Sequence, residues 1–338
     1  MRSVLALPRP VLRLISGGAA VYQGGRTLDP SFQFLAHQAR NRPSLTTLTP
    51  QEARAAVAEA LAAVAPPREA DVAVEALSAQ GAQGPLEARA YRPTDQDPAA
   101  PVLVYAHMGG GVIGDLDTCD GFCSLLAKLG RCAVLSVDYR LAPEHRFPAG
   151  LEDVLAAFRW ARDNADRFGA PVGAAAIGGD SIGGGFAAAV CQTLKREGAL
   201  QPALQLLIYP AVDAASETPS MTIYADAFPL SRQLIEWFVG HYVGPGDDPA
   251  DPRLSPLRAP HLSGLAPALI VTAGFDPLAD QGEAYARRLL ATGAPTIYRR
   301  HDSLAHGFTA YGGASPAADA ACRQIGGLLR EMIEGRRS

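Results

Sequence analysis

Residues 174–190 read AAAIGGDSIGGGFAAAV, and this stretch decides the fold prediction. An apolar run ends in two glycines, Ser181 follows shortly after, and an alanine-rich segment of helical composition comes next. The pattern Gly-x-Ser-x-Gly between a strand and a helix is typical of a strained turn that lifts a serine hydroxyl above the edge of a sheet. The helix N-terminus also favours negative charge that develops in a reaction. Because an ordinary N-cap serine would look similar, Ser181 needs support from other residues.

A nucleophilic serine needs a base, and the base needs an acid that orients it. His306 lies in a polar loop after a predicted strand, where it is free to reach the carboxyl edge of the sheet, and Asp276 directly follows a buried strand. Asp280, one helical turn later, is expected to be a structural acid at a helix N-terminus, and His301 could be a surface residue. The order Ser181, Asp276, His306 at strand ends of an open α/β sheet therefore predicts a catalytic triad.

A glycine-rich loop upstream of Ser181 allows two interpretations. Residues 105–115 read YAHMGGGVIGD, and the glycines at 109, 111 and 114 match the dinucleotide-binding fingerprint, with Asp138 closing the next apolar run. That interpretation leaves the serine, aspartate and histidine candidates unexplained. It also inserts His107 and Met108 between the strand and the first glycine, which loosens the tight turn that the fingerprint requires.

The second interpretation gives the loop a part in the reaction. Upstream of the nucleophile, after a buried strand, is where an oxyanion loop occurs on sheets of this kind. Backbone N–H groups there would act together with the N–H of Ile182, the residue after the nucleophile, on the negative charge of a tetrahedral intermediate. We prefer this interpretation because it uses Ser181, Asp276 and His306 as well.

The hydrophobic pattern predicts the architecture around these residues. Continuous apolar strands with helical crossovers indicate a parallel sheet that is covered on both faces, an α/β fold. The predicted parallel strands are residues 101–107, 133–139, 174–179, 204–210 and 268–274. Two earlier runs, at 71–77 and 86–93, are separated by a glycine-containing turn and predict an antiparallel hairpin.

Helices outside this alternation are predicted at two places. Residues 28–65 are predicted to be helical, with Thr49 as an N-cap, Pro50 as the first helical residue and Glu52 closing a capping box. Residues 216–256 contain a helix between proline-rich loops. Together the two segments are expected to form a smaller element over the sheet.

Composition and charge exclude several classes of protein. The 338 residues carry a formal net charge of −4, which is no electrostatic footprint for nucleic acid. Five scattered cysteines fit core thiols in a reducing compartment better than a disulfide framework or a metal site. No apolar window is long enough for a membrane span, and arginines interrupt the N-terminal apolar stretch too early for a signal peptide. We expect a cytoplasmic protein, with peripheral membrane contact through residues 1–20 as the alternative.

Several blocks together resemble the hormone-sensitive-lipase-like family of bacterial carboxylesterases. The resemblance covers nearly the whole chain and rests on HMGGGVIGDLDTCD (107–120), VDYRLAPEHRFPAGLEDV (137–154), GGDSIGGG (178–185), DPLADQGEAYARRL (276–289) and HGF (306–308). It implies an α/β-hydrolase fold, in which helices flank a mostly parallel central sheet. A small helical cap is implied for residues 1–65 and about 213–255, over a catalytic domain of residues 66–212 and 256–338.

The resemblance also implies roles for individual residues. Ser181 would be the nucleophile, His306 the base and Asp276 the acid of an acyl-enzyme mechanism on short-chain carboxylic esters. The implied oxyanion donors are the amides of Gly109, Gly110 and Ile182, and the implied oxyanion-loop and pocket residues are His107, Met108, Gly111 and Asp180. Glu144 would anchor the loop behind the site. The chemistry needs no metal and no organic cofactor, the partner would be a small ester, and a homodimer is in keeping with the family.

The loop departs from the family pattern at two positions. Members usually have His-Gly-Gly-Gly followed by an aromatic residue, whereas this chain has Met108 at the first glycine and Gly111 at the aromatic position. Met108 would be strained if that position needs a positive φ, and otherwise adds a flexible apolar side chain. Loss of the aromatic ring is expected to open space near the nucleophile that Met108 could partly fill. Ile182 replaces a smaller residue and is expected to crowd the turn.

Two alternatives stay beside the ester hydrolase. A hydrolase of lactones, carbamates or amides would use the same residues. A non-catalytic receptor that binds a small acid on the same fold would be a protein of another class. Such receptors typically lose the base or the nucleophile, whereas both His306 and Ser181 are present in this chain.

Overall fold

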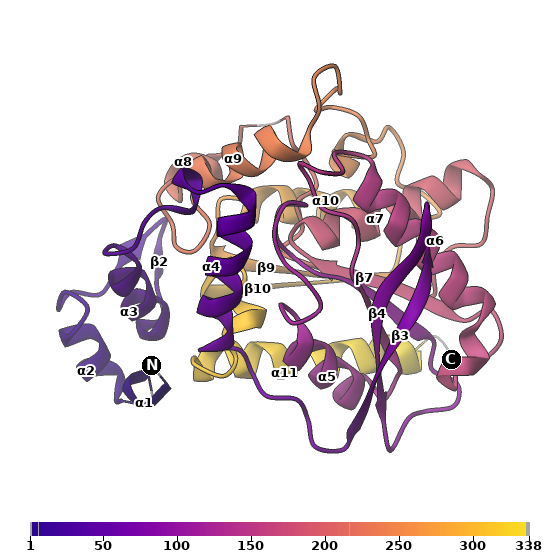
Figure 1. Ribbon diagram of the computed structural model, residues 1–338, viewed down its shortest axis with the longest axis horizontal. Helices are drawn as coiled ribbons and strands as arrows, with labels where there is room; N and C mark the ends of the chain where they lie inside the picture. Colours follow the sequence, from indigo (N-terminus) through magenta and orange to yellow (C-terminus); the bar gives the residue numbers. More distant parts are fainter. Residues whose placement is uncertain (1, 6, 216, 336–338) are drawn as a thin grey trace.

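The computed structural model, which describes residues 2–5, 7–215 and 217–335, is built around one eight-stranded sheet (Figure 1). The strand order is β10-β9-β8-β7-β5-β6-β4-β3, and only the contacts of β4 with β3 and with β6 are antiparallel. The strands are β3 (Val72–Gly81), β4 (Gly84–Pro93), β5 (Val102–Ala106), β6 (Val134–Val137), β7 (Ala175–Asp180), β8 (Gln205–Ile208), β9 (Ala268–Phe275) and β10 (Thr296–Ala305). The predicted hairpin and the five predicted parallel strands are therefore confirmed.

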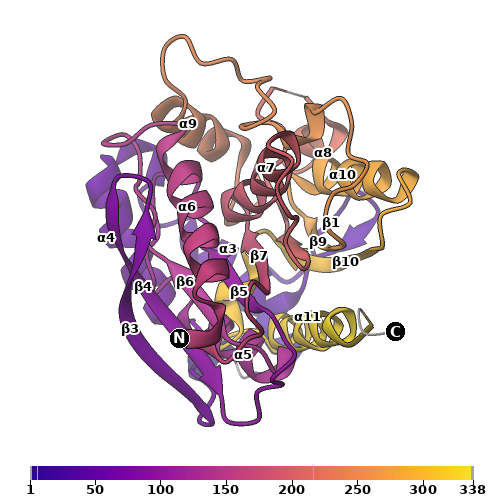
Figure 2. The same cartoon turned by 90° about the vertical axis from the view of Figure 1, so that its right-hand side faces the viewer.

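Helices cover both faces of the sheet (Figure 2). One face carries α5 (Asp120–Gly130) and α11 (Pro316–Gly335), which pack against each other, and the other carries α6 (Ala149–Asp163), α7 (Ile182–Arg196) and α10 (Ala279–Ala291). Strand β5 shows why both faces are needed. Val104 belongs to the core cluster under α6 and α7, whereas Leu103 belongs to the cluster under α5 and α11. Both side chains are buried, as expected for a strand with apolar residues at every position.

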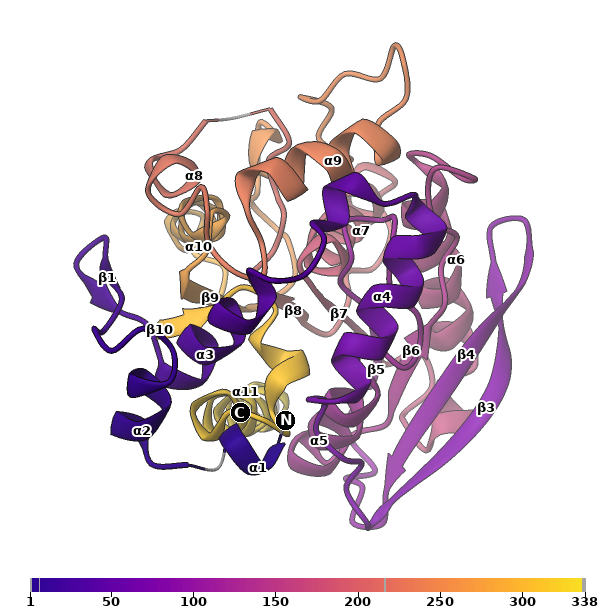
Figure 3. The same cartoon turned by 60° about the vertical axis from the view of Figure 1, so that its left-hand side comes forward.

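The remaining elements lie at one end of the molecule. They are α1 (Arg2–Leu5), α2 (Arg9–Leu14), the short hairpin β1 (Tyr22–Gln23) and β2 (Arg26–Thr27), α3 (Pro30–Ala39), α4 (Pro50–Ala62), α8 (Pro219–Ile223) and α9 (Arg232–Tyr242). Short 3₁₀ helices are η1 (Leu45–Thr47), η2 (Ala165–Phe168), η3 (Pro256–Arg258) and η4 (Phe308–Tyr311). Figure 3 shows α9 next to the N-terminal end of α4, and α9 also contacts η1. Two segments far apart in the sequence thus meet here.

The prediction that residues 28–65 are helical is wrong in the middle part of that range. Helix α3 ends at Ala39, and α4 begins only at Pro50. Pro43 explains the break, because proline has no N–H to donate and disfavours helical conformation in the residue before it. The predicted start of α4 is confirmed: Thr49 Oγ1 accepts a hydrogen bond from the Glu52 amide (3.3 Å), and Glu52 Oε2 accepts one from the Thr49 amide (2.9 Å).

The segment at 216–256 contains one helix more than predicted. The expected helix is α9, and the short α8 precedes it. All five cysteines of the chain are free and buried. Within the described residues, no helix has both the length and the hydropathy that are needed to cross a membrane.

Candidate active site

Ser181 stands at the sharp turn between β7 and α7. Its φ of 55° and ψ of −120° lie in a region that side chains other than glycine rarely adopt, so the turn is strained. Glycine is required on both sides, because a Cβ on Gly179 or on Gly183 would lie 2.6 Å or 2.1 Å from the Ala106 carbonyl oxygen of β5. The tight passage beside β5 is what the Gly-x-Ser-x-Gly pattern predicts.

The structure brings Ser181, His306 and Asp276 together. His306 directly follows β10, and its Nε2 lies 2.9 Å from Ser181 Oγ. Its Nδ1 lies 2.9 Å from Oδ2 of Asp276, which directly follows β9. The other carboxylate oxygen of Asp276 accepts a hydrogen bond from the Leu278 amide (2.8 Å). Asp276 is fully buried, whereas the serine and the histidine retain 8% and 5% exposure, so the hydroxyl and the imidazole can be reached from the cavity in front of them.

Two neighbouring candidates lie outside this hydrogen-bonded chain. Asp280 accepts a hydrogen bond from the Ser220 amide at the start of α8 (2.8 Å), which is the structural role expected for it. His301 lies in the middle of β10 and packs its ring against Phe308, with 5.3 Å between ring centroids. It is therefore partly buried against the protein, not a free surface residue.

The loop after β5, residues 107–115, has positive φ angles at its glycines and is called the glycine loop below. Gly109, Gly110 and Gly111 have φ values of 129°, 63° and 73°, which other residues adopt only with strain. The Gly109 carbonyl accepts hydrogen bonds from the amides of the third and fourth residues after it, both at 3.0 Å. Across the described part of the chain, no group accepts a hydrogen bond from the amides of Gly109, Gly110 or Ile182. These three residues and Ser181 line the same cavity.

Of the two departures from the family pattern, Met108 follows the second expectation given for it, whereas Gly111 differs from expectation. Met108 has no positive φ, so its side chain is accommodated without backbone strain. Its Sδ would lie 3.5 Å from a Cβ placed on Gly307, which means that the thioether rests beside the residue after His306. The space at Gly111 is not open: a Cβ there would lie 2.7 Å from Cδ2 of Tyr242. The ring that fills this space comes from α9, not from the loop.

Two other residues of the predicted site lie behind the cavity. His107 is fully buried and stacks on Tyr139 with 4.3 Å between ring centroids, and its Nδ1 donates to the Met108 carbonyl (2.7 Å). Burial lowers the pKa of His107 to about 4, which keeps the ring neutral. Asp180 is also buried, and its Oδ2 accepts hydrogen bonds from Tyr209 (2.9 Å) and Thr309 (3.1 Å). Burial raises the pKa of this carboxyl. Both residues support the site from behind.

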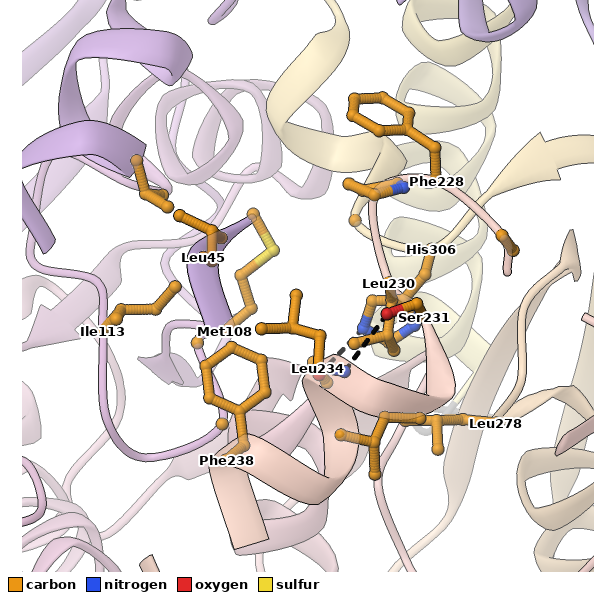
Figure 4. Close-up of a pocket in the computed structure, with 18 of the residues that line it drawn as sticks. Leu45, Met108, Ile113, Phe228, Leu230, Ser231, Leu234, Phe238, Leu278 and His306 are labelled. Atoms are coloured by element: carbon orange, nitrogen blue, oxygen red, sulfur yellow. Dashed lines mark hydrogen bonds between the residues drawn. The ribbon is translucent and has the colours of Figure 1, made fainter. Parts of the chain in front are cut away.

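The cavity in front of Ser181 has a volume of about 1350 Å³ and a mostly apolar lining (Figure 4). In the close-up, Met108 and Ile113 of the glycine loop face Leu234 and Phe238 of α9, and His306 lies on the opposite side. Further apolar lining residues are Leu45, Phe228, Leu230 and Leu278. Such a lining suits the hydrocarbon part of a ligand, with polar chemistry confined to one end.

Three residues with a bearing on the site have no signal in the sequence. Arg54 of α4 donates to the Val112 carbonyl of the glycine loop (2.8 Å) and to Glu144. Phe238 lies against Gly110, where a Cβ would come within 2.2 Å of its Cγ. Tyr209 has a φ of 34°, and its ring centroid is 4.7 Å from that of His306. Each contact joins parts of the chain that are distant in sequence, so no local pattern predicts it.

The chain is similar to known hydrolases over most of its length. A family model described as alpha/beta hydrolase fold matches residues 103–310. The carboxylic ester hydrolase LipN of Mycobacterium tuberculosis is 45% identical over 310 residues, which are 89% of this chain and 82% of that protein. An ethyl acetate hydrolase of Pseudomonas putida is 40% identical over 237 residues, which are 69% of this chain and 74% of that protein.

A solved structure extends the similarity to three dimensions. The ester hydrolase EH1AB1 from the metagenome of Lake Arreo, in complex with a derivative of bipyridine phosphonate, is 39% identical and superimposes with a TM-score of 0.86. The similarity covers 91% of this chain and 99% of that one. With the strand order, the turn at Ser181 and these relatives in agreement, the chain belongs to the α/β-hydrolase family, in its hormone-sensitive-lipase-like group of carboxylic ester hydrolases.

Proposed function

We propose that this carboxylic ester hydrolase is a serine esterase in which Ser181, His306 and Asp276 form the catalytic triad. The observation that carries the proposal is the continuous hydrogen-bonded chain from Ser181 Oγ through both ring nitrogens of His306 to Asp276, with 2.9 Å at each link. Nucleophile, base and orienting acid then stand in the arrangement that acyl transfer requires.

In the proposed first half-reaction, Ser181 Oγ attacks the ester carbonyl carbon while its proton moves to His306 Nε2. The tetrahedral intermediate collapses, the C–O bond to the alcohol breaks, and the same proton passes from Nε2 to the departing oxygen. Asp276 accepts the Nδ1–H throughout and stabilises the imidazolium. In the second half-reaction, His306 takes a proton from water, the resulting hydroxide attacks the acyl-enzyme carbonyl, and Ser181 recovers its proton as the acid leaves.

We propose the amides of Gly109, Gly110 and Ile182 as the oxyanion hole. They line the cavity together with Ser181, and no described group takes their hydrogen bonds, which supports this role. The Ile182 amide is also the first of α7, where the helix dipole favours negative charge. Backbone donors of this kind act on the charge of the intermediate and need no reorganisation during the reaction.

We also propose that residues 1–65 and about 213–255 form a cap over a catalytic domain of residues 66–212 and 256–338. Support comes from the cavity lining, since Leu45 and Leu234 from the two cap segments line the same cavity as Ser181 and His306. The preference for short acyl chains follows from the family alone. The cavity volume of about 1350 Å³ leaves room for larger esters.

We also propose a cellular location and an oligomeric state. A cytoplasmic location agrees with five free, buried cysteines, and a homodimer is in keeping with the family.

A receptor function is not favoured by the geometry, because a binding protein has no need for a serine and a histidine in hydrogen-bond contact. Lactone, carbamate and amide substrates would use the same residues.

The test is hydrolysis of p-nitrophenyl esters from acetate to dodecanoate, with Ser181→Ala beside the wild type. The proposal expects turnover by the wild type and none by the variant at equal folding. An organophosphonate should label the wild type at Ser181 and leave the variant unlabelled. Folded wild-type protein that neither turns over an ester nor takes the label would refute the serine esterase and bring the receptor forward.

A further inference from the structure

Helix α9 lies directly on the glycine loop. A Cβ on Gly110 would come within 2.2 Å of Cγ of Phe238, and a Cβ on Gly111 would come within 2.7 Å of Cδ2 and 2.9 Å of Cε2 of Tyr242. Distances this short mean that the two aromatic rings rest against the bare backbone, with no side chain between them (Figure 4 shows Phe238 beside the loop). The two aromatic rings that pack against the glycines of the loop therefore both come from α9.

Hydrogen bonds to the backbone carbonyls of Gly109 and Val112 restrain the loop, but its glycines bring no side chains of their own to pack. Three consecutive glycines with positive φ have no side chains to pack and a large conformational freedom to lose. The Gly111 carbonyl accepts one hydrogen bond, from the Ala142 amide (2.7 Å). On the side of α9 the nearest atoms to Gly110 and Gly111 belong to the side chains of Phe238 and Tyr242, and no hydrogen bond joins the loop to α9 among the described residues, so the position of the peptide units depends on where those two side chains are held.

Tyr242 is held firmly from behind. Its ring packs against Phe147 and Phe186, with 6.0 Å between centroids in each pair, and its carbonyl accepts a hydrogen bond from the Phe147 amide (2.9 Å). Arg146 donates to the Val243 carbonyl just beyond the helix (2.7 Å). The residue is only 3% exposed, and its hydroxyl has no hydrogen-bond partner among the described residues. The ring of Tyr242 therefore makes the contacts described above, and its hydroxyl makes no hydrogen bond within the described residues.

We infer that Tyr242 is a positioning residue for the oxyanion hole: its ring, fixed by Phe147 and Phe186, sets the backbone of the glycine loop from the cap side. The inference rests on the proposed roles of Gly109 and Gly110. N–H donors in an oxyanion hole stabilise the oxyanion only when they point at it. Without the Tyr242 ring the loop is expected to shift, so that stabilisation of the tetrahedral intermediate is lost while ester binding in the apolar cavity changes little. Tyr242 lines the same cavity as Ser181 and His306, and among the described residues no hydrogen bond or ring contact joins it to either of them.

The test compares Tyr242→Phe, Tyr242→Leu and Tyr242→Ala on p-nitrophenyl butyrate. The phenylalanine variant keeps the ring and should keep kcat, whereas leucine and alanine should lower kcat by about 10- to 100-fold with KM changed less than about threefold. His241→Ala is the control on the same helix, because that ring packs on Trp237 and not on the loop. Loss of kcat in the phenylalanine variant, or full kcat in the leucine and alanine variants, would overturn the inference.

A merely structural role is separated by two further readouts. Complete labelling by a p-nitrophenyl phosphonate at long times counts the active sites that remain folded in each variant, and kcat is expressed per labelled site. Gly111→Ala in the wild type and in Tyr242→Leu then forms a double-mutant cycle, and coupling between the two positions is expected because the added methyl meets the ring. Additive losses would contradict the contact. If the wild type itself neither labels nor turns over, the proposed function fails, and not this inference.

Discussion

The Arg54 guanidinium of α4 holds the carboxylate of Glu144, with Nη2 2.7 Å from Oε2 and Nη1 3.0 Å from Oε1. The same guanidinium donates to the carbonyls of Val112 and Ala142, each at 2.8 Å. One side chain of the proposed cap is thereby tied to the glycine loop and to the loop behind it. Glu144 consequently anchors more than its own loop, because through Arg54 it also holds α4.

This ion pair predicts an acid-sensitive contribution to stability. Hydrogen bonds from Arg54 lower the pKa of Glu144 to about 2 from an ordinary value of 4.5. Because the folded pKa lies below the unfolded one, the contribution is present above pH 4.5 and is lost as the pH falls through about 2. The melting temperature of the wild type should exceed that of Glu144→Gln at neutral pH, and the difference should shrink between pH 4.5 and 2.

The control for that comparison is Glu331→Gln on α11. Glu331 is exposed, and no cation among the described residues pairs with it. Its substitution should shift the melting temperature little and without the same dependence on pH. A constant difference between wild type and Glu144→Gln over the whole range would show that the ion pair does not stabilise α4.

The proposed triad predicts how the effects of substitutions combine. Ser181→Ala, Asp276→Asn and His306→Ala should each lower kcat by about 10⁴-fold, since each removes one member of a unit that transfers a single proton. The double variant Ser181→Ala/His306→Ala should be little worse than either single variant. Losses that multiply in the double variant, measured on p-nitrophenyl acetate, would show that the two residues act independently.

The backbone of the glycine loop should tolerate no side chain at Gly109. A Cβ there would lie 1.9 Å from the Ile113 carbonyl oxygen, and the φ of 129° excludes other residues. Gly109→Ala should therefore displace a proposed oxyanion donor and lower kcat by about 10²–10³-fold. Gly327→Ala is the matched control, because that glycine is exposed on α11 with open space around it. It should retain activity and gain about 0.5–1 kcal/mol of stability.

Met108 should limit the size of the ester. Its thioether lies beside Gly307 and lines the cavity next to the base. Met108→Ala should raise kcat/KM for octanoate relative to acetate by about 10-fold or more, since a few methylene-sized contacts discriminate by that amount. Met332→Ala on α11, outside the cavity lining, should leave the ratio unchanged. An unaltered chain-length profile of Met108→Ala would mean that the side chain does not restrict the acyl or alcohol group.

Much of the fold is predictable because its signals are local. Glycine is required on both sides of Ser181, because a Cβ on Gly179 or Gly183 would lie 2.6 Å or 2.1 Å from the Ala106 carbonyl oxygen of β5. The spacing of these glycines alone therefore indicates the turn. The apolar strands are continuous because helices cover both faces of the sheet, and that pattern is visible without a structure. The break between α3 and α4 is the exception, because the composition of residues 28–65 is helical while Pro43 interrupts the helix.

The surroundings of the site are much less predictable. Gly111 alone suggests an empty space, and only the fold brings Tyr242 to it from 131 positions further along the chain (242 − 111). The backbone of Met108 illustrates the same limit, since its φ depends on the path of the loop and not on its neighbours in sequence. Arg54 likewise has three partners that lie 58 to 90 residues away. Packing between distant segments decides these features, and single-sequence patterns do not record it.

The order of the site residues along the chain has a consequence for folding during synthesis. Ser181 and His306 are 125 positions apart, and the strand that delivers the histidine, β10, is the last of the sheet and lies at its edge. During synthesis, the strands that deliver the glycine loop and the serine emerge long before the base does. On the proposed triad, a growing chain therefore has no working esterase until His306 has left the ribosome. During refolding, the return of activity requires that β10 has docked against β9, since His306 directly follows β10.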